Sequence, residues 1–205
     1  MRVSLIGLIA GVVFVLSIVS ASAQPAQTPA LDGFWGLKFG SSATESRKFI
    51  ESKHTGTIDE KETNADVLTL MAPDFAGKTP TAMIFQFERD KFHTGIVFYT
   101  PTDDSKVLDL YSGLRSDLID KYGKPANDLR VFEKPYSDGD GDETEAIKHG
   151  LATVAVMWLF DRADGLKNSI TLEIRPSLAI ALTYQDGKLI KEAVDAQKAK
   201  TIKDY

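Results

Sequence analysis

The segment of this chain with the clearest capacity for chemistry is a short acidic stretch in its second half. Asp138, Asp140 and Asp142 alternate there with single glycines. Carboxylates at this spacing can present the hard oxygen ligands that Ca²⁺ prefers. The stretch departs from an EF-hand loop, because Glu143 stands where that loop needs glycine and His149 where it needs a bidentate glutamate. Two interpretations stay open, a Ca²⁺-binding loop of another kind and a solvated loop without metal, and no other cofactor is expected.

Other residue types that could support catalysis do not occur in a recognisable catalytic pattern. His54, His93 and His149 are too far apart for ligands on one helix, and no H-E-x-x-H is present. No serine lies within G-x-S-x-G, and the chain has no cysteine, which excludes a thiolate nucleophile and disulfides. An enzyme would have to assemble Asp, Glu and His side chains from distant segments. An exported hydrolase of that kind is the alternative function.

The N-terminus predicts export. Arg2 gives a basic start, Leu5–Val19 is an apolar run, and residues 21–23 read A-x-A. These features are typical of a secretory signal peptide over 1–23 that is cleaved near Ala23, and the run is shorter than the roughly 20 residues of a membrane span. Without cysteine there is no lipid-attachment site, so we expect a mature periplasmic or secreted protein without a membrane anchor.

Composition predicts one domain after the signal peptide. Residues 24–30 contain two prolines and no periodicity, which predicts a flexible linker, and residues 31–205 are expected to form a single α+β domain. Lysine and arginine number 24 against 29 aspartate and glutamate, and the formal net charge is −5. The basic residues form no cluster, so nucleic acid is not an expected partner.

Capping and periodicity predict the helices that must position any site. A capping box at Ser42 begins a helix over 43–53. Apolar residues recur every three or four positions through 107–122, and Gly123 ends that helix. A charged C-terminal helix is expected over 188–203.

Alternation of apolar and polar residues predicts antiparallel strands over residues 81–89 and 169–175, and further strands are expected over 93–100, 129–132, 153–160 and 178–184. Two short strands are expected between 55 and 71, and a long acidic loop over 136–150. Strand 153–160 is apolar on both sides, which predicts a central place in the sheet. A helix followed by antiparallel strands occurs twice. We therefore expect a two-layer α+β fold, one antiparallel sheet with helices packed on one face and an internal α-β-β repeat.

The face of this sheet without helices is the candidate binding surface. It is expected to carry polar and small side chains, among them Thr171, Glu173, Arg175 and Thr183. Antiparallel sheets often leave such a face in water. The face could equally dock a partner protein, and the sequence leaves both readings open.

Several segments also resemble a known group of proteins. The entry to the first helix is GFWGLKFGSSATE at 33–45, the second helix closes with LIDKYGKP at 118–125, and a late strand with Trp158 precedes LTYQD at 182–186. With the order of elements, these segments resemble exported bacterial tandem helix-plus-sheet domains, similar to the β-lactamase-inhibitor-protein fold and to the small lipoprotein of the outer-membrane β-barrel assembly machine. The chain lacks the lipoprotein's anchoring cysteine and the inhibitor's disulfides. The resemblance implies a binding or scaffold role on a sheet face, without catalytic apparatus.

The expected function is therefore that of an exported, soluble, non-enzymatic domain that binds another envelope or secreted protein through its open sheet face and loops. A third reading, beside the hydrolase, is a carrier that holds a small apolar molecule between helices and sheet. A closed core under the helices would argue against the carrier. A deep pocket with convergent carboxylates or histidines would favour the enzyme.

Overall fold

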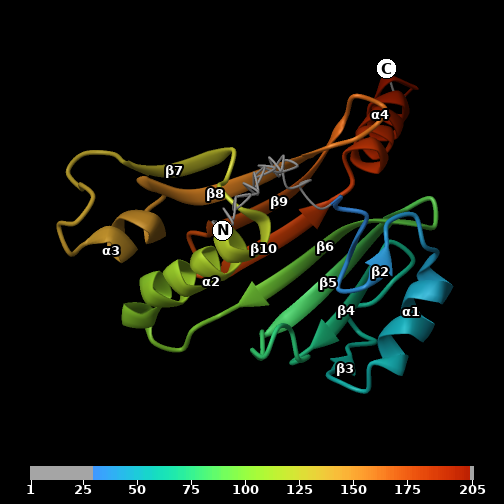
Figure 1. Ribbon diagram of the computed structural model, residues 1–205, viewed down its shortest axis with the longest axis horizontal. Coiled ribbons are helices and arrows are strands. Elements are labelled where there is room, and N and C mark those ends of the chain that lie inside the picture. Colours follow the sequence, from blue (N-terminus) through green and yellow to red (C-terminus); the bar gives the residue numbers. More distant parts are fainter. Residues whose placement is uncertain (1–29, 204–205) are drawn as a thin grey trace, which may run out of the picture.

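An antiparallel sheet of eight strands forms the body of the protein in a computed structural model that describes residues 30–203 (Figure 1). The predicted signal peptide and all but the last residue of the predicted linker lie outside the described residues. The predicted α+β class, with an antiparallel sheet, is confirmed. In their order across the sheet, the strands are β3 (Thr57–Ile58), β4 (Val67–Met71), β5 (Ala82–Glu88), β6 (Lys91–Tyr99), β10 (Ile180–Gln185), β9 (Lys167–Ile174), β8 (Ala152–Asp161) and β7 (Asn127–Phe132).

The chain builds this sheet from two similar halves. In the first half α1 (Ala43–Ser52) is followed by β3 to β6, and in the second α2 (Val107–Tyr122) is followed by β7 to β10. The last strands of the halves, β6 and β10, pair at the centre of the sheet, and β3 and β7 form its edges. The internal repeat expected from the sequence is present, with four strands after each helix rather than two.

The helices α1 and α2 begin and end within one residue of the positions that their local sequence predicts. At α1 the Ser42 hydroxyl accepts from the Glu45 N–H at 3.2 Å, and the Glu45 carboxylate accepts from the Ser42 N–H at 2.9 Å, which completes the capping box. A short 3₁₀ turn (Asp104–Lys106) leads into α2, and Gly123 ends that helix with φ 78°. The residues of α2 that are buried against the sheet are Val107, Tyr111, Leu114 and Leu118.

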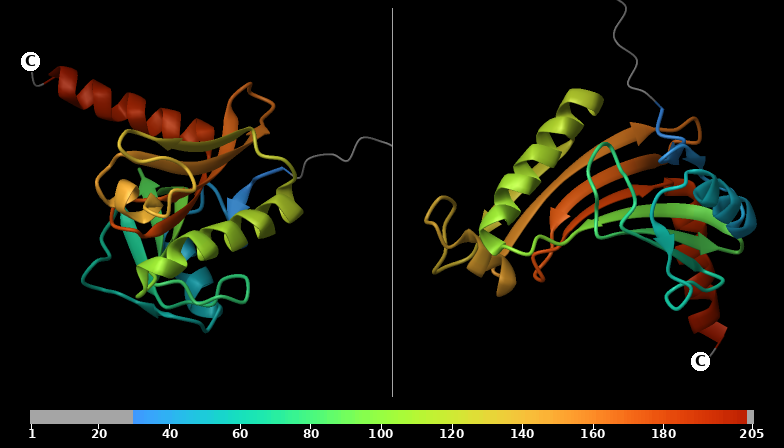
Figure 2. Two further views of the ribbon diagram at one scale, coloured as in Figure 1. Left: turned by 90° about the vertical axis from the view of Figure 1, so that its left-hand side faces the viewer. Right: turned by 90° about the horizontal axis from the view of Figure 1, so that it is seen from below.

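The sheet is strongly curved, and α1 and α2 lie on its convex side (Figure 2). A small hairpin of β1 (Gly33–Phe34) and β2 (Leu37–Lys38) packs on this covered side, where Phe34 is buried. The helix α4 (Gly187–Lys203) follows β10 and leaves the sheet toward the concave side (Figure 2). Apart from the start of α4, no described element lies against the concave side. We call this concave side the open face.

Two local expectations differ from the structure. Strand β8 lies second from an edge rather than centrally. Its second apolar side belongs to the open face, where Leu159 is exposed, so an apolar run on both sides did not require a central place. The loop expected at 136–150 contains the helix α3 (Glu143–Lys148). Ala146 and Ile147 of this helix are buried, so an apolar pair anchors the otherwise acidic segment to the body.

Candidate binding face of the sheet

Strand register brings the four predicted binding residues together on the open face. Thr171 of β9 lies directly opposite Thr183 of β10, and Glu173 lies two positions further along β9 and so on the same face. Arg175 follows the end of β9, and its Nε donates to Glu173 Oε1 at 3.1 Å. The Arg175 guanidinium also lies 4.9 Å from the ring centre of Phe98 in β6, in cation–π contact.

The middle of the open face is partly buried by its own curvature. Thr94, which lies beside the start of α4, and Ala181 are buried on this face. Side chains on the concave side of a bent sheet converge, so neighbours shield one another. One row of directly opposite residues crosses seven strands through this middle, and it consists of Thr69, Ile84, Ile96, Thr183, Thr171, Met157 and Asn127. Within the row, two apolar residues, Ile84 and Ile96, lie next to the two threonines Thr183 and Thr171.

Exposed apolar side chains flank this middle on both sides. Five large apolar residues of the described chain are exposed, and the four that belong to the sheet lie on the open face: Met71 (37%), Leu129 (46%), Val131 (54%) and Leu159 (38%). The fifth, Val194, belongs to α4. Sequence reasoning did not select these residues. The alternation in β7 indicated that Leu129 and Val131 share a face, but it could not say that this face is open.

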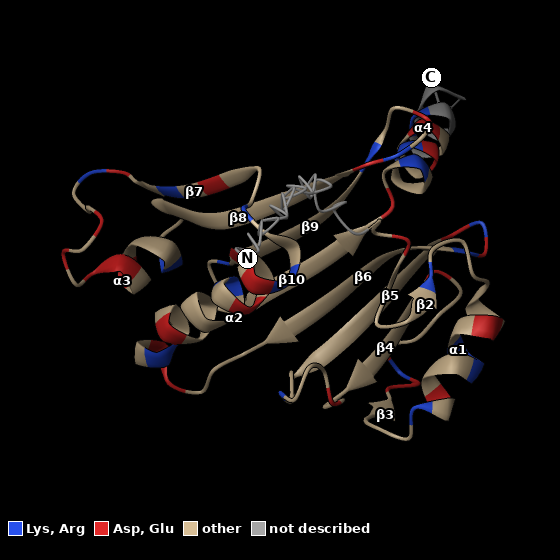
Figure 3. Ribbon diagram, viewed as in Figure 1, with Lys and Arg blue, Asp and Glu red and all other residues tan. Residues whose placement is uncertain are grey.

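Charged residues lie mostly outside the central strands (Figure 3). Strand β10 has no charged residue, and acidic and basic side chains are interspersed along the helices and loops. On the open face the pair Glu173–Arg175 is internally neutral. The face therefore offers hydroxyl groups and apolar side chains rather than a strong field of one sign.

The carboxylates of the acidic loop are directed at groups of the protein itself. Asp138 pairs with Arg130 of β7. Asp140 accepts from the Ser137 N–H at 2.7 Å and from the Asp142 N–H at 2.9 Å, and these backbone hydrogen bonds lower the pKa of Asp140. Among residues 30–203, no group of three or more histidine and acidic side chains is placed to hold a metal ion. Calcium binding by Asp138, Asp140 and Asp142 stays a hypothesis.

The three histidines lie in separate parts of the structure. His54 follows α1, His149 follows α3, and His93 is buried in β6, where its Nδ1 lies 2.8 Å from the Thr94 hydroxyl. Burial lowers the pKa of His93, and the charges of Glu88 and Asp186 oppose that effect in part. The three histidines therefore do not meet in one site.

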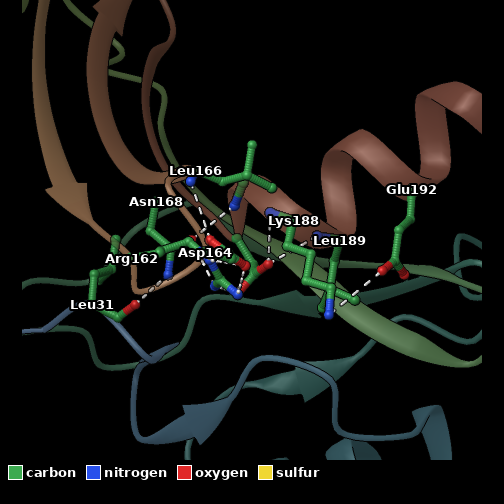
Figure 4. A network of polar contacts seen from close by, with 10 residues as sticks. Leu31, Arg162, Asp164, Leu166, Asn168, Lys188, Leu189 and Glu192 are labelled. Atoms are coloured by element: carbon green, nitrogen blue, oxygen red, sulfur yellow. Dashed lines mark hydrogen bonds and ion pairs between the residues drawn. The ribbon is translucent and has the colours of Figure 1, made fainter.

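A buried polar network fixes the start of α4 and the start of the described chain to one end of the sheet (Figure 4). Asp186 caps α4 by accepting from the Lys188 and Leu189 N–H groups at 3.0 and 2.9 Å. Its other oxygen accepts from Arg162 Nη1 at 2.5 Å. Asn168 donates to the Leu31 carbonyl at 2.5 Å. The network joins groups of the protein to one another, so we assign it a structural role.

A cavity of about 540 Å³ opens on the covered side, between the β1–β2 hairpin and the C-terminal end of α2. This volume lies within the range of small-molecule sites. Its aromatic and basic lining consists of Trp35, Phe75, Tyr122, Tyr184, Lys38 and Lys121. Burial raises the pKa of Tyr184 well above its ordinary value of 10.0, and the neighbouring Tyr122 hydroxyl adds to that rise. The layer between helices and sheet is therefore not closed at this end.

No helix within residues 30–203 is long and apolar enough to cross a membrane. No protein-family model matches the chain, and comparisons with curated proteins and with solved structures found no match.

Proposed function

We propose that this protein is an exported, non-enzymatic binding domain that docks another envelope or secreted protein through its open face. The observation that carries the proposal is the distribution of exposed apolar side chains. Met71, Leu129, Val131 and Leu159 all lie on the sheet face that α1 and α2 leave open. Large apolar side chains left exposed on an open sheet face are candidates for contact with another molecule.

The chemistry of the face describes the partner surface that it fits. Met71 lies toward one edge of the sheet and Leu159 toward the other, with the hydroxyl groups of Thr171 and Thr183 between them. A convex protein surface with two separate apolar contacts and hydrogen-bonding groups between them would match this arrangement. Apolar anchors combined with polar contacts are the usual composition of a protein–protein interface.

Export is part of the proposal and depends on residues before the described chain. The basic start, the apolar run Leu5–Val19 and the A-x-A site at 21–23 support a cleaved signal peptide. The absence of cysteine in the sequence supports release without a lipid anchor. The resemblance to exported tandem helix-plus-sheet domains supports the same compartment and the same use of a sheet face.

Substitution on the open face tests the proposal. Affinity capture of the wild-type protein from the cell-envelope fraction, read by mass spectrometry, defines the co-purifying proteins. Leu159→Lys and the double variant Glu173→Ala/Arg175→Ala are expected to lose the specific partner. Val194→Lys is the matched control, because Val194 is also exposed but lies on α4. An unchanged set of partners in all variants would contradict the proposal.

The cavity supports a second candidate function, the carriage of a small aromatic or apolar anion. Its aromatic walls suit a flat apolar body, and Lys38 and Lys121, against the single acidic lining residue Asp32, suit a negative group. The dye 8-anilinonaphthalene-1-sulfonate has this chemistry and serves as the probe. Saturable binding that Ala30→Trp weakens, since Ala30 lines the cavity, would support the carrier. Binding equal in the wild type and the variant would contradict it.

A further inference from the structure

Strand β7 leaves a hydrogen-bonding edge without a partner in the described part of the protein. It is the last strand of the sheet and pairs only with β8 (Figure 1). Glu133 continues this pairing, since its N–H donates to the Leu151 carbonyl at 2.7 Å. In an antiparallel pair the bonded positions alternate. The N–H and C=O groups of Asp128 and Arg130 therefore point away from β8.

The side chains of β7 protect this edge only on one side. Exposed edge strands are commonly short, interrupted by proline, or carry charged side chains. Here the strand has six residues, and its open-face positions Leu129 and Val131 are the two most exposed large apolar residues of the sheet. Only the covered side carries charges, those of Asp128 and Arg130. The combination favours the addition of another strand.

We infer that the occupant of this edge is β7 of a second copy of the chain, paired antiparallel about a two-fold axis at Leu129. For the two strands to bond, residues whose backbone N–H and C=O groups point out of the sheet must lie opposite one another. The possible registers therefore differ in whether Asp128 and Arg130 of one copy lie opposite Asp128 or Arg130 of the other. One register places Asp128 opposite Asp128 of the second copy, and another places Arg130 opposite Arg130. Only the register centred on Leu129 sets Asp128 opposite Arg130 twice, and opposite charges at facing positions stabilise a sheet.

Contacts within each copy extend this charge pattern. Asp128 is paired with Arg115 of α2, and Arg130 with Asp138 of the acidic loop. Across the two-fold axis, positive and negative charges would then alternate. The order would be Arg115 and Asp128 of one copy, followed by Arg130 and Asp138 of the other. On the open face, Leu129 would meet Leu129 of the second copy. Such an interface is self-complementary, as a two-fold dimer requires.

Dimerisation joins the two sheets into one and places the two open faces side by side. It also covers Leu129 while leaving Leu159 and Met71 exposed for a partner. This pairing stands whether or not the open face binds another protein.

The absence of cysteine gives a direct test of the register. Directly opposite residues have Cα atoms about 4.5–5.5 Å apart, within reach of a disulfide. Purified Leu129→Cys protein, oxidised with copper phenanthroline, is therefore expected to form a covalent dimer on non-reducing electrophoresis. Val131→Cys is the matched control. Its Cα would lie four residues, about 13 Å, from its counterpart and should cross-link poorly. Equal cross-linking of both variants, or none in Leu129→Cys, would overturn the inference.

Sedimentation equilibrium provides the second measurement on the wild-type protein. We expect a reversible dimer, and we expect Leu129→Lys to weaken it at least about tenfold because two ammonium groups would meet on the axis. Leu159→Lys, on the same face but on β8, should leave the dimer intact. Circular dichroism checks that both variants fold. A wild-type protein that stays monomeric at high micromolar concentration would overturn the inference.

Discussion

The ring of Phe34 lies directly on Gly95. A Cβ atom added to Gly95 of β6 would stand 2.2 Å from Phe34 Cδ1, which no packing arrangement tolerates. Through this contact the β1–β2 hairpin inserts one aromatic ring into the covered side of the sheet. Phe34 packs there beside Phe85 and Tyr184, with ring centres 5.4 and 5.1 Å away. Gly95 therefore provides the space into which Phe34 of the β1–β2 hairpin packs, and this hairpin forms one wall of the cavity.

Gly95→Ala is expected to destabilise the protein, because the added methyl group must displace a buried ring. Overpacking of this kind lowers the free energy of unfolding by about 1–3 kcal/mol. Urea unfolding followed by circular dichroism measures the change. Gly113→Ala is the control, since a Cβ at Gly113 of α2 meets nothing within 4 Å. It should raise stability by about 0.5–1 kcal/mol through helix propensity. A neutral Gly95→Ala variant would refute the contact.

Asp186→Ala is expected to destabilise the end of the sheet that carries α4. The substitution removes the helix cap and leaves Arg162 without its buried carboxylate partner. Loss of one member of a largely buried pair lowers the free energy of unfolding by about 2 kcal/mol or more. Asp164→Ala removes the more exposed partner of the same arginine and should lower the free energy of unfolding clearly less, because solvent screens this pair. Equal effects of the two substitutions would show that burial at Asp186 is unimportant.

His93 is expected to weaken the fold in mild acid. Burial lowers the pKa of His93 in the folded protein below its ordinary value of 6.5. The unfolded chain therefore takes up the proton first as pH falls through about 6.5, and stability declines from there until the folded pKa is passed. His93→Asn removes this dependence. Between pH 7.5 and pH 5.5 the urea midpoint of the wild type should fall more than that of the variant. An equal fall in both proteins would contradict the prediction.

Tyr111→Phe is expected to leave stability unchanged or raise it at neutral pH, because the buried Tyr111 hydroxyl has no hydrogen-bond partner within the described residues. Burial raises the pKa of Tyr111 to about 12. Above pH 10 the unfolded chain loses its phenolic proton more readily than the folded protein, so wild-type stability falls between pH 10 and 12. The variant should lose less stability over this range in thermal denaturation. A variant clearly less stable at pH 7 would indicate a partner for the hydroxyl.

Local sequence patterns predicted most elements and left the use of their surfaces open. The capping box at Ser42, the stripe along 107–122 and the alternation in 81–89 each depend on residues a few positions apart, and all three elements are present. Strand β8 shows the limit of such patterns. Its apolar residues on both sides indicated burial on both sides, whereas Leu159 lies exposed on the open face.

Patterns among residues close together in the sequence thus determined the α+β class and the repeated order of helix and strands. They also determined which small and polar side chains share the open face. Tertiary structure decided that this face is concave, that Arg175 lies over Phe98, and that Asp138 turns to Arg130. It also left β7 as an open edge. These outcomes depend on sheet twist and on partners distant in the chain. The spacing of residues in a sequence predicts contacts within one helical turn or one strand. It does not predict the curvature of the sheet, which brings side chains of separate strands together.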